Sequence, residues 1–394
     1  MAFRVYIYPG GSAGMALYSY KLSNALSDEG LQVTLFVDAQ YELDDQPARF
    51  IKAKVLSSGN IGIRPNQHRI VRAINILVAH LLNWYGFYRC VRKERPQILH
   101  IQSLFYLVDW YMLGFFKRIN NAKLVLTVHD VMPHKFYTRR FGRLELAMLQ
   151  YMYDKADRLI VHAETNKQQL LENFSVDKHK VVVIPHGEYS LSRMSQEISE
   201  SQARSILDLD DNQKVILFFG YIRKTKGIDI LLKAFDRVAE RFPGAVLVIS
   251  GSVIQGESFS EYGQIMCQMK YKSRVKCLIE YIEHQDIPVF FRPADIVVLP
   301  YLQFHSQSGV LHLAQGFGKA VIVTNVGGLP EVVEDQTTGL IVPPGDVDRL
   351  AWAMTYLLEN EELRTEMGRR AKKMAMERFS WNAIAKATIE KAYS

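Results

Sequence analysis

One stretch of the chain, residues 305–331, limits the fold more than any other. A small polar turn, Ser306 to Gly309, leads into an apolar segment that runs from Val310 to Phe317. A buried strand, Asp295 to Pro300, comes before it, and a β-branched run, Val321 to Thr324, comes after it. The first amides of a helix have no partner within the helix and the helix dipole is positive there, so the turn predicts an anion site. The whole pattern predicts a parallel β/α unit whose ligand lies at the carboxyl ends of the strands.

Taken alone, this pattern also fits an ordinary βαβ crossover with a glycine in its turn. Further motifs, in a fixed order, favour the ligand site. The sequence FFGYIRKTKGIDILLKAF occupies Phe218–Phe235, GLIVPPGD occupies Gly339–Asp346, and FSW occupies Phe379–Trp381. With the first stretch, these motifs resemble the carboxyl-terminal half of the family-4 glycosyltransferases, which are retaining enzymes of GT-B architecture. The resemblance covers essentially the whole chain.

The resemblance implies an α/β fold of the GT-B type, in which two Rossmann-like β/α/β domains face each other across a deep cleft. A length of 394 residues independently favours two domains. The polar, serine-rich residues 188–200 predict the linker between them. We expect an amino-terminal acceptor domain in residues 1–190, which a returning helix at 382–394 completes, and a nucleotide-sugar donor domain in residues 191–381.

Composition indicates a globular protein, since 48% of the residues are hydrophobic and 23% are charged. The cysteines Cys90, Cys267 and Cys277 are scattered, so we expect a reducing compartment, no disulfide framework and no metal site. A strand at Phe3 to Tyr8 leaves no visible signal peptide, and no uncharged apolar run reaches the length of a membrane helix. The expected location is the cytoplasm.

The positive charge is concentrated in the first half of the chain. Residues 1–190 carry a net charge of +8 and the remainder −1, which together give the +7 of the whole protein. Such a basic half attracts phosphates or an anionic surface. No nucleic-acid module is recognisable, so we expect no nucleic-acid partner.

A helix with basic ends is predicted between residues 69 and 95. Its apolar residues recur at spacings of three and four, and they are Ile70, Ile74, Leu77, Val78, Leu81, Tyr85 and Tyr88. Core packing is the more common explanation of such a stripe, and a face that rests on a bilayer is the alternative. The aromatic segment 104–119 and the basic patch 134–143 also fit a membrane surface. The hypothesis is therefore a peripheral association with the inner face of the plasma membrane.

Transfer of a sugar requires that the departing diphosphate be stabilised. Arg223 and Lys226 lie in the turn after the strand that begins at Lys214, from which their side chains can reach a ligand. Lys226 stands at the Lys-Gly position of the family. The usual Gly-Arg is Gly220-Tyr221 here, so we infer that Arg223 takes the place of the arginine. The alternative is that both are solvated charges of a turn.

The backbone amides of Ser308, Gly309 and Val310 are expected to hold the distal phosphate. In the resembling family, the glycine-rich loop that corresponds to Gly10–Gly14 faces the donor, and the loop with Gly327 and Gly328 lines the sugar or phosphate. For the first loop, the alternative is a tight βα turn. Glu331 either accepts bonds from sugar hydroxyls or caps the next helix. The predicted residues of the donor sugar and its loops are Gly10, Gly11, Gly14, Gln307, Gly327, Gly328 and Glu331.

The sequence departs from the family at two glutamates that normally stand eight positions apart, one at the donor sugar and one at the ribose. Neither of two alignments places a carboxylate there, since they give His305 with Leu313 or Ser306 with Ala314. Gln307 and Gln315 reproduce only the spacing. Recognition of the sugar and ribose must therefore be rearranged, whereas phosphate binding by amides does not depend on these carboxylates.

His129 and Asp130 end the strand that begins at Lys123, and they are the predicted catalytic residues. His129 matches a family histidine near the donor sugar, where an imidazole could bond a hydroxyl or stabilise an oxocarbenium-like charge. A structural role is the alternative for it. Asp130 could orient the acceptor. We expect structural roles for His162 and His186, and no protein general base, because the diphosphate takes the acceptor proton in retaining members of this fold.

These observations predict a metal-independent, retaining glycosyltransferase without a cofactor. It would move a hexose from a UDP- or GDP-linked sugar to a glycan or lipid-linked acceptor, in the biosynthesis of a surface polysaccharide or glycoconjugate. The alternative is a catalytically inactive GT-B subunit that binds glycan or nucleotide, or serves as a scaffold.

Overall fold

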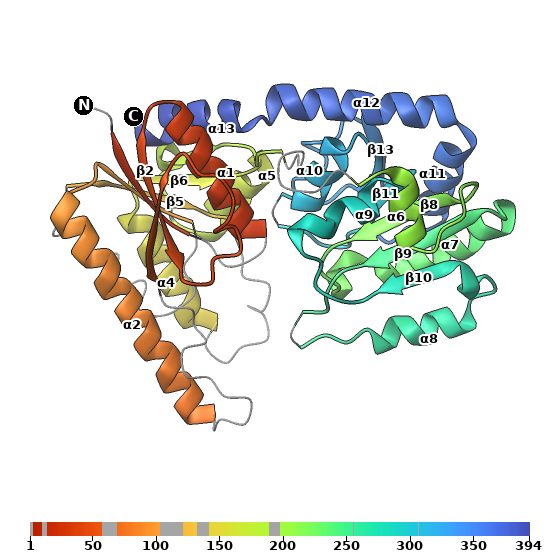
Figure 1. Cartoon of the computed structure of the whole chain (residues 1–394), viewed down its shortest axis with the longest axis horizontal. Helices are drawn as coiled ribbons and strands as arrows, with labels where there is room; N and C mark the ends of the chain where they lie inside the picture. The colour runs from red at the N-terminus through yellow and green to blue at the C-terminus, as the bar shows by residue number, and fades with distance from the viewer. Residues whose placement is uncertain are drawn as a thin grey trace. The chain divides into compact units, whose positions relative to one another are not determined.

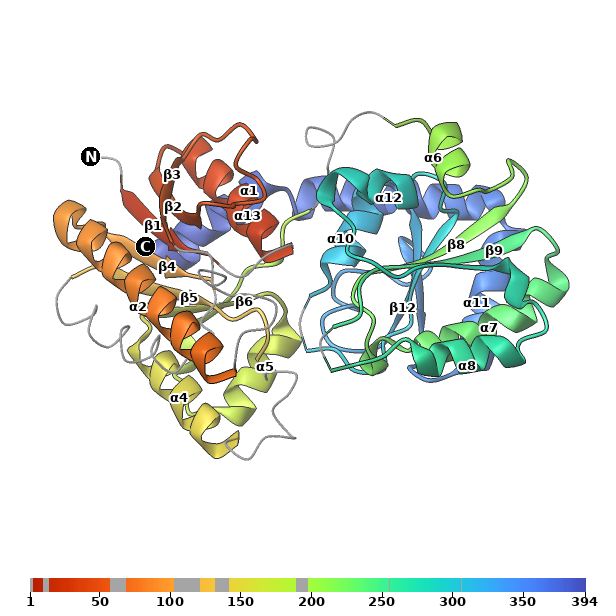
Figure 2. The same cartoon turned by 60° about the horizontal axis from the view of Figure 1, so that its bottom comes forward.

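The chain divides into two compact units, Met1–Gly187 with Trp381–Ser394 and Glu188–Ser380 (Figures 1 and 2). Each is built on its own sheet, and every pair of neighbouring strands is parallel. The computed structural model describes residues 3–9, 14–56, 69–102, 121–131, 142–188, 198–254, 256–305 and 307–394.

The first unit holds a seven-stranded sheet in the order β3-β2-β1-β4-β5-β6-β7. Its strands are β1 Arg4–Tyr8, β2 Gln32–Asp38, β3 Ile51–Leu56, β4 Ile98–Ile101, β5 Lys123–Thr127, β6 Arg158–Val161 and β7 Val181–Val183. Its described α-helices are α1 Gly14–Asp28, α2 Arg69–Glu94, α4 Gly142–Lys155, α5 Glu164–Asn173 and α13 Trp381–Thr388, and a π-helical turn, Ile389–Tyr393, follows α13.

Both faces of this sheet are covered, which is why its strands, apart from the edge strand β3, are almost continuously apolar. On one face, Tyr8 of β1 stacks on Trp84 of α2, with ring centroids 5.0 Å apart and planes 7° apart. Phe87 packs edge-on against the same tyrosine, and α4 completes this layer (Figure 1). Helices α1 and α13 lie on the other face.

The end of the chain packs onto the first unit. A Cβ atom placed on Gly187 would lie 2.4 Å from the indole of Trp381, so the first residue of α13 fits only against a glycine. The hydroxyl of Tyr393 lies 2.7 Å from Nδ1 of His100, a ring that is completely buried in β4. Nε2 of the same ring lies 2.7 Å from the hydroxyl of Thr127.

The second unit holds a six-stranded sheet in the order β10-β9-β8-β11-β12-β13. Its strands are β8 Lys214–Phe219, β9 Ala245–Ser250, β10 Val275–Leu278, β11 Ile296–Leu299, β12 Ala320–Thr324 and β13 Gly339–Val342. Its α-helices are α6 Glu200–Ile206, α7 Ile228–Arg241, α8 Ser260–Gln268, α9 Ile287–Phe291, α10 Gly309–Gly316, α11 Val347–Glu359 and α12 Glu361–Arg378. Figure 2 shows α7, α8 and α11 on one face of the sheet and α10 and α12 on the other.

In both sheets the order of the strands reverses once, between β1 and β4 and between β8 and β11. This is the topology of a Rossmann-like domain, and it confirms the predicted fold class. The predicted aromatic segment 104–119, the basic residues 134–141 and residues 189–197 of the predicted linker lie outside the described residues.

Helix α2 leaves most of the apolar stripe that the sequence shows exposed, although Tyr88 is partly buried against the core. Ile74, Leu77, Val78, Leu81 and Tyr85 are between 44% and 58% exposed, so core packing is the wrong explanation for these residues. A different set faces the core, and it consists of Ala79, Asn83, Trp84, Phe87 and Val91. No helix in the described part of the chain is long and apolar enough to cross a membrane.

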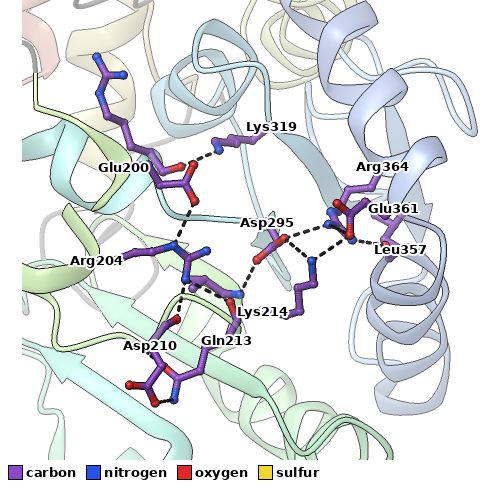
Figure 3. A network of polar contacts seen from close by, with 12 residues as sticks. Glu200, Arg204, Asp210, Gln213, Lys214, Asp295, Lys319, Leu357, Glu361 and Arg364 are labelled. Atoms are coloured by element: carbon purple, nitrogen blue, oxygen red, sulfur yellow. Dashed lines mark hydrogen bonds and ion pairs between the residues drawn. The ribbon is translucent and has the colours of Figure 1, made fainter. Parts of the chain in front are cut away.

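Asp295 connects β8 with α12 at the amino-terminal edge of the second sheet (Figure 3). One of its carboxylate oxygens accepts the amide of Val215 in β8 at 2.8 Å, and the other accepts Nη2 of Arg364 in α12 at 2.9 Å. The Arg364 side chain is only 7% exposed and also donates to the carbonyl of Leu357 at 3.0 Å. Because this network lies at the amino ends of the strands, we infer a structural role for it.

We predict that Asp295→Ala lowers the free energy of unfolding by about 3 kcal/mol, because the buried Arg364 guanidinium then keeps, among the described residues, only the exposed carboxylate of Glu361, 3.5 Å away, as an anionic partner. Urea denaturation measures this loss. The matched control is Asp348→Ala, which removes the exposed ion pair with Arg237 and should cost less than about 1 kcal/mol. Equal losses in the two variants would contradict the structural role of the network.

The stability of the protein should fall in mild acid, partly through His100. Burial lowers the pKa of this ring to about 3, well below the unfolded value near 6.5. The unfolded state therefore binds the proton first, and stability is lost as the pH falls below about 6.5, by up to about 1.4 kcal/mol per pH unit for this ring. Denaturation of wild type and His100→Gln across this range should show a flatter dependence in the variant. Parallel curves would contradict the assignment.

Candidate active site

The loops that carry the predicted donor residues meet at the carboxyl edge of the second sheet. Strands β8 and β11 are neighbours there, and they flank the point at which the strand order reverses. Ligands of open α/β sheets bind in the crevice outside such a point. The loop after β8 carries Arg223 and Lys226, and the loop after β11 leads to Ser308 at the start of α10.

Close packing of backbone on backbone fixes these two loops together. Gly227 has φ of +66°, and a Cβ atom placed on it would lie 2.0 Å from the carbonyl oxygen of Pro300. The amide of Leu302 also donates to the carbonyl of Thr225 at 2.8 Å. The side chain of Lys226 is therefore held against the loop that follows β11.

Lys226 lies among aromatic rings instead of in solvent. It is 9% exposed, and its ammonium lies 3.3 Å from the ring centroid of Tyr301 and 4.6 Å from that of Phe304. The π faces of both rings attract the cation without neutralising it. The prediction that places Lys226 at a binding site fits this arrangement better than the alternative of a solvated turn charge.

Arg223 approaches the same tyrosine. Burial raises the pKa of Tyr301 to about 12, while its hydrogen bond with Ser308 and the positive charge of Arg223 act in the opposite direction. The Nε atom of Arg223 is buried and has no hydrogen-bond partner among the described residues. A buried donor without a partner is rare in folded proteins and fits a site that an anionic ligand completes.

Helix α10 begins beside these cations. Ser308 is its N-cap, and the Ser308 hydroxyl accepts the amide of Leu311 at 3.4 Å and lies 3.2 Å from the hydroxyl of Tyr301. Gly309 is the first helical residue. A Cβ atom on Gly220, at the end of β8, would lie 3.1 Å from the side chain of Val310. The predicted phosphate-binding turn and the cationic loop therefore meet at one place.

The structure separates the two glutamines that share the family's glutamate spacing. Gln315 is completely buried, and its Nε2 donates to the carbonyl of Val332 at 3.0 Å, so it anchors a loop. Gln307 is 8% exposed and stands just before the start of α10, with its Oε1 3.4 Å from Nε2 of His312. Only Gln307 lies at the predicted site.

The loop after β12 packs against the loop after β11. A Cβ atom on Gly327 would lie 2.4 Å from the carbonyl oxygen of Phe304, and φ of Gly327 is +54°. Gly328 is buried and Glu331 is exposed. The amides of residues 332 and 333 both donate to the carbonyl of Leu329, which makes a turn. The alternative that Glu331 caps a following helix is wrong, since the next helix starts at Val347.

In the first unit, His129 and Asp130 follow β5 as predicted, and Asp130 is exposed. The two ring nitrogens of His129 have different neighbours. Nε2 lies 3.2 Å from Oε1 of Gln102, and Nδ1 lies 3.1 Å from Nε2 of His162. Of the predicted glycines on this side, Gly14 begins α1, whereas Gly10 and Gly11 lie outside the described residues.

Sequence reasoning missed that three histidines form one cluster. The ring of Tyr18, in α1, has its centroid 5.0 Å from that of His129, 5.4 Å from that of His162 and 4.9 Å from that of His186. The signal in the sequence was a histidine shortly after each of three adjacent strands, β5, β6 and β7. Because carboxyl ends of parallel strands share one edge, such residues meet.

The described residues form a cavity away from the predicted site residues, and they form no metal site. Among the described residues, no group of three or more His, Cys, Asp or Glu side chains is arranged to hold a metal ion. A cavity of about 390 Å³ lies between β13 and α11, where Trp352 and Tyr356 line it. None of the predicted site residues borders it.

Comparisons with known proteins cover both units. A family model described as group 1 glycosyl transferases matches residues 199–374, and one described as glycosyltransferase family 4 matches residues 12–187. A glycosyltransferase of Methanocaldococcus jannaschii is 30% identical over 338 residues, which cover 82% of this chain and 84% of that protein. The D-inositol 3-phosphate glycosyltransferase of Corynebacterium aurimucosum is 26% identical over 398 residues, which cover 98% of this chain and 91% of that protein.

The fold agrees with solved structures. Anabaena HepE in complex with UDP and glucose matches with a TM-score of 0.76 at 18% identity, over 100% of both chains. The order of motifs, the two Rossmann-like sheets and these matches point to one family. The chain belongs to the group 1, family-4 glycosyltransferases, which are retaining GT-B enzymes that transfer a sugar from a nucleotide sugar.

Proposed function

We propose that the second unit binds the nucleotide-sugar donor and that Arg223, Lys226 and the first turn of α10 hold its diphosphate. The observation that carries this proposal is the convergence of these groups at the point where the strand order reverses. Two cations and the amides of Ser308, Gly309 and Val310 supply positive charge where negative charge develops on the leaving group. Such a site works without a metal ion.

The proposed reaction retains the configuration at the anomeric carbon. The bond from this carbon to the diphosphate breaks while the acceptor oxygen bonds on the same face, and a diphosphate oxygen takes the acceptor proton. His129 contacts the donor sugar in this scheme and Asp130 orients the acceptor. The neutral imidazole of His129 fits a hydrogen bond to a sugar hydroxyl, because burial and the nearby His162 lower its pKa to about 3.

We propose a hexose linked to UDP or GDP as the donor and a glycan or lipid-linked acceptor. The structure of HepE with UDP and glucose supports uridine and a hexose. The name of the corynebacterial relative adds a phosphorylated polyol as a second acceptor class. Proposed contacts to the sugar and its loops are Gly10, Gly11, Gly14, Gln307, Gly327, Gly328 and Glu331.

A non-catalytic subunit was the alternative because the paired glutamates are missing. Family membership favours an enzyme, and the groups proposed for the diphosphate do not include those carboxylates. Gln307 is buried just before α10, close to the positions at which the family has its glutamates. Its amide carries no charge, so a hydrogen bond from Gln307 to the sugar or the ribose would be a neutral one.

A thermal-shift panel of UDP-, GDP-, ADP- and TDP-sugars, with and without EDTA, tests the proposal. A ligand at about a hundred times its dissociation constant adds about 2.7 kcal/mol of stability, which raises the melting temperature visibly. We expect UDP- or GDP-sugars to stabilise the wild type, EDTA to have no effect, and Arg223→Ala and Lys226→Ala to abolish the shift.

Lys224→Ala is the matched control. Lys224 lies in the same loop, but its side chain is 73% exposed and its ammonium pairs with Glu261 at 3.2 Å. This variant should keep the full shift. The proposed diphosphate site would be wrong if no nucleotide sugar stabilised the wild type, or if Lys224→Ala lost the shift as completely as Lys226→Ala.

We also propose that the exposed face of α2 rests on an anionic membrane. Apolar side chains on this face are half exposed, and Arg89, Arg92 and Lys93 are exposed near the carboxyl end of the helix. Apolar and basic residues on one helix are typical of interfacial binding. Such a position would bring the enzyme to a lipid-linked acceptor on the inner face of the plasma membrane.

Sedimentation with vesicles of phosphatidylglycerol and phosphatidylcholine at low salt tests this surface. The wild type should bind, and a double variant with Leu77→Glu and Leu81→Glu should not, because both charges would enter the apolar layer. Ile206→Glu is the control, since Ile206 is 63% exposed on α6, a helix of the second unit. Absence of wild-type binding, or an equal loss in the control, would overturn the proposal.

A further inference from the structure

The carbonyl oxygen of Ile184 fixes the proton on His162. Nδ1 of this ring lies 2.9 Å from that oxygen, and a carbonyl only accepts, so Nδ1 carries the hydrogen. In a neutral imidazole the other nitrogen is then an acceptor. Nε2 of His162 faces Nδ1 of His129 at 3.1 Å, so Nδ1 of His129 must donate to it.

Both rings are neutral near pH 7, so this assignment holds. His162 is 2% exposed, and burial lowers its pKa to about 4. Burial and His162 lower the pKa of His129, and His100 adds to the effect, while Asp130 opposes it. Tyr18 and His186 are also buried against these rings.

Gln102 completes the chain of hydrogen bonds. Its side chain is 1% exposed and its Oε1 lies 3.2 Å from Nε2 of His129, which would place two acceptors against each other. The Gln102 Nε2 has no hydrogen-bond partner among the described residues. Nitrogen and oxygen of an amide are assigned from the hydrogen-bond network. Turning the amide over lets Gln102 donate to His129 and removes the conflict.

We propose that His162 and Gln102 are positioning residues, which hold His129 as the tautomer with hydrogen on Nδ1 and an acceptor at Nε2. Hydrogen bonds then run in one direction, from Gln102 to His129, on to His162 and finally to the carbonyl of Ile184.

This chain of hydrogen bonds limits which donor sugars the enzyme can bind. The inference about the sugar rests on the proposed contact between His129 and the donor. In the free protein, the one lone pair on Nε2 of His129 accepts from the Gln102 amide, and Nε2 has no hydrogen to donate. A sugar group that replaces the Gln102 amide at Nε2 must therefore be a donor. The sugar must therefore present a hydroxyl there, and a carboxylate at that position would face a lone pair. A neutral hexose fits this requirement, whereas a uronic acid whose carboxylate took that position does not.

Nitrogen-15 NMR of the histidine rings in the free protein tests this chain of hydrogen bonds from Gln102 to Ile184. We expect His129 to show a protonated Nδ1 and an unprotonated Nε2, unchanged from about pH 5.5 to about pH 8. A protonated Nε2, or a ring that titrates near its ordinary pKa, would overturn the proposal. This measurement needs no substrate, so its outcome is independent of whether the proposed donor binds.

Two variants of His162 separate a positioning role from simple packing. A glutamine amide reaches the position of the lost Nε2 and can still accept from His129, whereas the shorter asparagine can replace only Nδ1. His162→Gln should therefore keep the tautomer of His129, and His162→Asn should shift it measurably toward hydrogen on Nε2. Circular dichroism establishes that both fold. If both folded variants kept the wild-type tautomer, His162 would not set it.

Discussion

The contact between Gly227 and the carbonyl oxygen of Pro300 is the constraint on which the proposed donor site depends. No side chain fits at Gly227, because a Cβ atom there would lie 2.0 Å from that oxygen. This close contact between the two loops places the ammonium of Lys226 over the rings of Tyr301 and Phe304. Tyr301 in turn meets Ser308 at the start of α10. A backbone contact thus brings two cations and a helix terminus together at one edge of a sheet.

The two units share a strand order but differ in the charge of their carboxyl edges. In the second unit the candidate groups are a lysine and an arginine, and the ammonium of Lys226 lies over the rings of Tyr301 and Phe304. In the first unit burial keeps the histidines neutral, with the pKa of His162 lowered to about 4. Cationic side chains suit a diphosphate and neutral imidazoles suit sugar hydroxyls, so the two sets of residues fit the roles that we propose for them.

The sequence was sufficient for the features that depend on local pattern. Continuous apolar runs predicted parallel strands, and the order of the loops placed Lys226 and Ser308 at one edge. Features that depend on contacts between distant segments were missed, such as the rings around Lys226 and the bond from Gln315 to Val332. Helix α2 shows the same limit, since periodicity identifies an apolar stripe but does not say which of two candidate faces meets the core.

Calorimetric titration with nucleotides tests the central claim most directly, because it isolates the second phosphate. If Arg223, Lys226 and the start of α10 hold a diphosphate, UDP or GDP should bind at least about tenfold more tightly than the matching monophosphate, or about 1.4 kcal/mol. Arg223→Ala should remove most of this advantage. Equal affinities for diphosphate and monophosphate in the wild type would contradict the account.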